Sequence, residues 1–170
     1  MGNKRHIWKW TAYGAVLFLA LILQGAVCPF ITAGGAHPNL TVTLVIVVAL
    51  FEGALSGSLC GALIGLFTGL LLFPGGVFYM IVFFALGFVS GRFLAVYFKK
   101  SLSTALLWSL GSLFCVELLY YLCFFMLTGK GGLVSFAPVV FGELIVTLPF
   151  IPLLYAPVRL AYRKWGKNLE

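Results

Sequence analysis

Long apolar runs separated by short polar or basic segments define the pattern of this chain. The candidate runs are 10–30, 40–73, 77–91, 101–116 and 144–158, and the only charged residue inside them is Glu52. An apolar helix needs about 20 residues to cross a bilayer. The runs are continuous rather than alternating, which favours helices over the strands of a membrane barrel. The pattern therefore predicts an all-α integral membrane protein.

The run 40–73 is too long for a single crossing. Its 34 residues would extend about 51 Å as one helix, whereas the hydrocarbon core is about 30 Å thick. Two short spans fit better, with a turn within 52–57, where Glu52 is followed by glycines and a serine. Each span is then slightly short, and we expect some local thinning of the bilayer.

The basic residues provide an independent test of this hairpin. Lys and Arg accumulate on the cytoplasmic side of membrane proteins, and here they form clusters at 4–9, 99–100 and 159–167. An even number of crossings places all three clusters on one side. We therefore predict a single domain, 1–170, with six spans and both termini in the cytoplasm. The predicted spans are 10–28, 39–52, 57–73, 77–98, 102–127 and 136–158.

The first run also has the basic-then-apolar order of a secretory signal. It is long and lacks a small-x-small cleavage site, so we expect an uncleaved first span.

Composition narrows the class of protein further. Hydrophobic residues make up 62% of the chain and charged residues 9%, and the mean hydropathy is +1.13. A soluble domain needs more polar surface than this. The net charge of +7 follows from the predicted cytoplasmic clusters and does not indicate nucleic-acid binding.

Glycine recurs every fourth residue in part of the chain, at positions 53, 57, 61, 65 and 69, and again at 87 and 91. Residues four apart lie on nearly one face of a helix, and small residues let helix backbones approach closely in lipid. One interpretation is packing within the bundle. The other is docking of a partner helix. The candidate contact set for that docking is Gly61, Gly65, Gly69, Gly87 and Gly91.

Ionisable residues within or next to the spans are the second set of candidates, because charge in hydrocarbon is costly and needs a partner, water or a route to the interface. Arg92 lies about 10 Å along a helix from Lys99 and can extend towards the interface. Glu52 lies near the same side. Either the two pair with one another, or both simply reach the interface.

Glu117 and Glu143 fall at similar depth in the outer half of the last two predicted spans. Two interpretations remain open for this pair. The carboxyls can couple transport to protons, or one neutral acid can hydrogen-bond across helices or to a partner subunit. Replacing Glu117 by Gln separates them, because hydrogen bonding should largely survive the change and proton coupling should not.

Enzymatic chemistry has little support in the sequence. Neither the four cysteines nor the two histidines have metal-ligand spacing. Phosphate-loop, hydrolase-elbow and zinc-protease motifs are absent. We expect no cofactor, no metal and no catalytic set.

Several stretches together resemble the MreD family of bacterial rod shape-determining membrane proteins. They are 61–76 (GALIGLFTGLLLFPGG), 85–92 (ALGFVSGR), 116–120 (VELLY), 143–149 (ELIVTLP) and 157–164 (PVRLAYRK). The family commonly has an Asp about where Phe73 stands here, so this chain differs at that position.

The resemblance implies a noncatalytic scaffold of the cell-elongation machinery in the bacterial inner membrane. Its implied partner is MreC, and through it the peptidoglycan polymerase and transpeptidase. MreD-like proteins are similar in fold to the substrate-binding S-components of energy-coupling-factor vitamin transporters, which is the alternative function. S-components resemble one another in a pair of alanines four residues apart on the first span. The first span here has no such pair, which counts against that alternative. The polar groups predicted at the outer side are few, namely Asn39, Thr41, Lys130 and Ser135.

Overall fold

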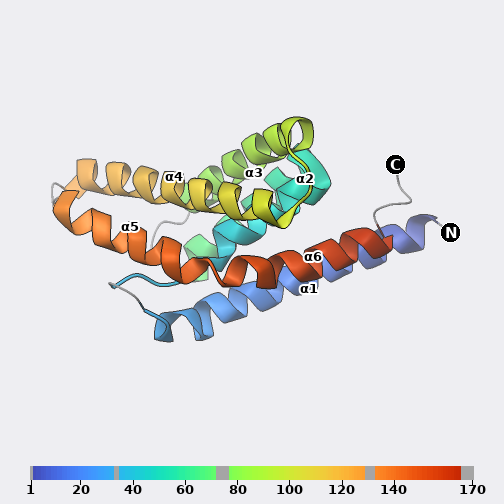
Figure 1. Ribbon diagram of the computed structural model, residues 1–170, viewed down its shortest axis with the longest axis horizontal. Helices are drawn as coiled ribbons and strands as arrows, with labels where there is room; N and C mark the ends of the chain where they lie inside the picture. The colour runs from blue at the N-terminus through green and yellow to red at the C-terminus, as the bar shows by residue number, and fades with distance from the viewer. Residues whose placement is uncertain (1, 33–34, 72–76, 129–132, 166–170) are drawn as a thin grey trace.

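The computed structural model describes residues 2–32, 35–71, 77–128 and 133–165. All elements in these ranges are helices, as the apolar runs predicted (Figure 1). They are α1 (Gly2–Ala26), the short 3₁₀ helix η1 (Cys28–Phe30), α2 (Leu40–Leu71), α3 (Val77–Tyr97), α4 (Leu102–Thr128), α5 (Leu133–Thr147) and α6 (Phe150–Trp165).

Helix α2 folds back on itself at Gly53. This residue has φ 82° and ψ −169°, a backbone conformation that is essentially restricted to glycine. A Cβ atom added at Gly57 would lie 2.7 Å from the Cβ of Ala49, although eight residues of straight helix span about 12 Å. The two halves are therefore antiparallel, and the predicted hairpin is confirmed.

The first half of α2 is the centre of the molecule. Every residue from Leu40 to Phe51 is buried, and the half packs among α1, α4 and α6 as well as its own second half. A helix enclosed on all sides needs no polar face. This explains why the sequence over this segment is apolar without any period.

Helix α3 packs antiparallel against the second half of α2, backbone to backbone. A Cβ added at Gly65 would lie 2.7 Å from the carbonyl carbon of Tyr79, and one at Gly91 would lie 2.6 Å from Cα of Ala54. Gly61 and Gly87 make equally close approaches to Phe83 and Gly57. Packing this close leaves no room for a side chain between the two helices.

The glycine face is thus occupied within the chain, which corrects one prediction. Gly61, Gly65, Gly87 and Gly91 pack α2 against α3 and do not present a docking face to a partner helix. The fifth candidate, Gly69, is half-buried near the end of α2.

The predicted last span, 136–158, is a broken helix rather than a continuous one. It consists of two helices, because Pro149 lacks the N–H that a continuous helix requires. The segments Ala137–Thr147 and Phe150–Lys164 meet at 46°. Hydrogen bonds from Leu148 N to Leu144 O (3.2 Å) and from Ile151 N to Leu148 O (3.3 Å) keep the break short.

The start of α1, the fold-back of α2, the α3–α4 link and the end of α6 lie at one end of the bundle, at the right in Figure 1. We call this the basic end, because Lys9, Lys99, Lys100 and residues 159–164 lie there. Helices α1, α3 and α4 are each long and apolar enough to cross a bilayer, as is the α5–α6 pair taken together, whereas α2 meets the same test only over both of its antiparallel halves. This arrangement is that of a multi-pass membrane protein.

The α2–α3 contact predicts a large effect of one methyl group. Gly65→Ala should lower the free energy of unfolding by about 1–3 kcal/mol, because rigid backbone rather than a flexible side chain must move. A Cβ added at Gly14 on α1 would meet nothing within 4 Å, so Gly14→Ala is the matched control and should be neutral or slightly stabilising. Chemical unfolding in detergent micelles measures both, and equal stabilities would contradict the packing assigned to Gly65.

Candidate functional site

A polar cavity of about 220 Å³ lies at the end of the bundle opposite the basic end. Residues from five helices and the segment before α2 form its walls. Its principal polar wall residues are Gln24, Asn39, Thr68, Tyr79, Glu117 and Glu143. A partly open pocket with several converging polar groups is a usual form of a binding site.

The two membrane glutamates meet at this cavity. Glu117 from α4 and Glu143 from α5 both line this pocket, which brings together the two carboxyl groups that the sequence placed at similar depth. Glu143 is only 7% exposed.

Asn39 caps the start of α2 and joins it to α5. The Oδ1 atom of Asn39 accepts from Thr41 Oγ1 (2.8 Å) and from Val42 N (3.2 Å), which caps the start of α2. The backbone N–H of Asn39 also donates to Thr147 Oγ1 at 2.9 Å. Helix α5 is thereby joined to the start of the central helix.

Gln24 and Thr68 are cavity residues that sequence reasoning missed. Gln24 Nε2 donates to Pro38 O at 2.9 Å, and Gln24 Oε1 accepts from Leu40 N at 2.7 Å, so this side chain joins α1 to α2. The available signal was a single amide within an otherwise apolar run. Thr68 is 1% exposed, and its Oγ1 has no hydrogen-bond partner among the described residues.

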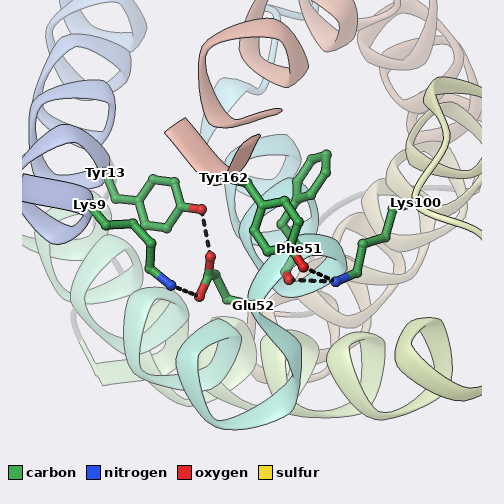
Figure 2. A network of polar contacts seen from close by, with 6 residues as sticks. All are labelled: Lys9, Tyr13, Phe51, Glu52, Lys100 and Tyr162. Carbon is green, nitrogen blue, oxygen red and sulfur yellow. Dashed lines mark hydrogen bonds and ion pairs between the residues drawn. The ribbon is translucent and has the colours of Figure 1, made fainter. Parts of the chain in front are cut away.

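A second polar cluster lies at the basic end, shown in Figure 2. Lys9 Nζ contacts Glu52 Oε2 at 2.7 Å, and Tyr13 OH donates to Glu52 Oε1 at 2.7 Å. The side chains of Lys9 and Glu52 are 7% and 8% exposed. The pairing of Glu52 with Arg92 that the sequence suggested is wrong, because α1 supplies the cation and Arg92 is exposed on α3.

Lys100 forms hydrogen bonds on the other side of the same fold-back. Its Nζ donates to Phe51 O at 3.2 Å and to Tyr162 OH at 2.7 Å, as Figure 2 shows. A cation at the last carbonyls of a helix is favourable, because the helix dipole is negative there. The backbone oxygen of Lys100 in turn accepts from Tyr155 OH at 3.1 Å. The start of α4 is thus attached to both α2 and α6.

An apolar groove of about 530 Å³ separates α3 from α4. Small residues form part of its surface, namely Ala85, Ser90, Gly111, Ser112 and Cys115, with Trp108 beside them. A Cβ added at Gly111 would meet nothing within 4 Å. The groove is therefore open, in contrast to the filled contact between α2 and α3.

Comparisons with protein-family models, with curated proteins and with solved structures find no match to this chain. Among the described residues, no three His, Cys, Asp or Glu side chains come together as a metal site would require.

The buried ion pair predicts a loss of stability that a second substitution restores. Lys9→Met leaves the Glu52 carboxylate without its cation and should cost roughly 3–5 kcal/mol. Adding Glu52→Gln removes the unpaired negative charge and keeps an acceptor for the Tyr13 hydroxyl. The double variant should therefore regain most of the lost free energy of unfolding. Unfolding midpoints of the single and double variants in micelles measure the effect. Equal stabilities for Lys9→Met and the double variant would refute the charge argument.

Proposed function

We propose that this chain is a noncatalytic membrane scaffold of the bacterial cell-elongation machinery, and that it acts by forming a complex with MreC in the inner membrane. The family resemblance of the sequence supports this proposal. In it the basic end faces the cytoplasm, in accord with the distribution of Lys and Arg. Through MreC the complex would influence the peptidoglycan polymerase and transpeptidase.

The observation that carries the proposal is the groove between α3 and α4. Helices associate in lipid through close packing at small residues rather than through the hydrophobic effect. Gly111 and Cys115 lie one helical turn apart on α4 and line this groove. It is apolar and lies along two helices that are long enough to span a bilayer. We assign the transmembrane helix of MreC to this groove.

The glycine face is not the contact surface in this proposal. Its closely packed backbones make α2 and α3 one rigid pair. Helix α3 contacts α2 extensively and α4 only slightly. The side of α3 that faces α4 is therefore left open.

Filling the groove should block the complex. Gly111→Leu adds a side chain where the chain has open space, so the fold should tolerate it while MreC recovery falls about tenfold or more. Gly14→Leu is the matched control, because that exposed helical glycine also has nothing within 4 Å. Copurification of MreC from native membranes, together with cell shape, measures the outcome. Unchanged recovery and unchanged rods with Gly111→Leu would overturn the assignment.

The polar cavity favours a second candidate, a substrate-binding S-component of an energy-coupling-factor transporter. The sequence predicted few polar groups at this end, whereas the structure brings Gln24, Thr68 and the two glutamates to one cavity. An S-component would copurify with an ATPase module and bind a vitamin tightly. A scaffold would copurify with MreC, so the same membrane preparation separates the two candidates.

A further inference from the structure

We propose that the basic end binds the headgroup of an anionic phospholipid, at a seam between α6 and the start of α4. The seam consists of Arg159 and Arg163 on α6 and Lys100 in the α3–α4 link, and we call it the basic seam. This inference goes beyond the scaffold function and does not depend on the partner helix.

Tyr155 joins the two sides of the basic seam. Its hydroxyl donates to the backbone oxygen of Lys100 at 3.1 Å, and the guanidinium carbon of Arg159 lies 5.7 Å from the centre of its ring. Arg163 follows Arg159 by four residues, so both lie on nearly one face of α6. Lys100 Nζ also donates to the hydroxyl of Tyr162, the residue before Arg163, at 2.7 Å. Cations from two segments distant in the sequence are therefore gathered at one place.

The charge of the basic seam is not balanced by the described part of the chain. Glu52 is the only acidic residue among the described residues of the basic end, and its carboxylate already contacts Lys9 at 2.7 Å. Arg159 and Arg163 are both exposed, and neither forms an ion pair with a described residue. A ligand that binds here should therefore be an anion.

The cations have the geometry that suits a phosphate. A guanidinium group presents its N–H donors in one plane and binds phosphate oxygens in pairs. Contact with the face of the Tyr155 ring restrains the Arg159 group and leaves those in-plane donors free. The Lys100 ammonium has three N–H donors and uses two of them, for Phe51 O and Tyr162 OH (Figure 2). The third is available to the same anion.

The surface of α6 next to the arginines favours a lipid over a soluble anion. Ala156 and Pro152 lie on the same helical face as Arg159, three and seven residues before it, and both are exposed. Leu153 and Leu160 beside them are 56% and 66% exposed. An acyl chain can lie along this apolar strip while its phosphate meets the arginines, and basic groups at a membrane surface attract anionic headgroups.

Native mass spectrometry of the purified full chain, titrated in micelles with single phospholipids, tests this proposal. Dioleoylphosphatidylglycerol should bind about tenfold more tightly than dioleoylphosphatidylcholine, which has the same acyl chains and a phosphate but no net charge. Inorganic phosphate in excess should not displace the lipid, because it cannot use the apolar strip. Equal affinity for the two lipids, binding of neither, or displacement by inorganic phosphate would overturn the proposal.

Two variants that each remove one exposed arginine form a matched pair. Arg159→Gln should weaken phosphatidylglycerol binding about fivefold or more, the effect expected of one basic residue at a headgroup. Arg92 is also exposed but lies on α3, outside the basic seam, so Arg92→Gln should change the affinity less than about twofold. Equal losses in both variants would indicate a general attraction to the charged end and would contradict the site.

Arg163→Gln provides a second measurement, because the loss of Arg159 also removes a contact with the buried Tyr155 ring. Arg163 is exposed, so its replacement should leave the unfolding midpoint in micelles unchanged while phosphatidylglycerol binding weakens about fivefold. Unchanged binding in Arg163→Gln would refute the assignment of the headgroup to the basic seam, whatever the stability of Arg159→Gln.

Discussion

The reversal of α2 at Gly53 is the constraint on which the other contacts depend. It places one half of α2 in the middle of the bundle and the other half against α3. A buried helix end is costly unless its carbonyls and any adjacent charge find partners. Here α1 supplies Lys9 to Glu52 and the α3–α4 link supplies Lys100 to Phe51 O. The fold-back therefore fixes where α1, α4 and α6 lie.

The two ends of the bundle treat their carboxyl groups differently. At the basic end, Glu52 has a lysine and a tyrosine and is a closed structural unit. At the other end, Glu117 and Glu143 line one pocket, and its described lining residues include no lysine or arginine. The contrast is between a carboxylate that is paired within the fold and two carboxyl groups that line a pocket.

Sequence reasoning predicted the features that depend on the length of an apolar run and on the depth of a residue in the membrane. The 34-residue run 40–73 exceeds one crossing, and the hairpin follows from that excess. The meeting of Glu117 and Glu143 likewise follows from two depths in neighbouring helices. Lys9 was not recognised as the partner of Glu52, because which helix faces which residue is set by tertiary packing. The α3–α4 groove was hidden for the same reason, since apolar sequences look alike whether they face protein or lipid.

Helix α4 links the two candidate sites. Gly111 and Cys115 face the groove, while Glu117 and Tyr120 face the cavity. Cys115 and Glu117 are two residues apart, about 200° around a helix, so the sites occupy opposite faces of one element. Because α4 contacts α3 only slightly, its position relative to α3 is set mainly by its contacts with α2, α5 and α6. A helix seated in the groove and an occupant of the cavity would therefore bear on the same element from its two sides.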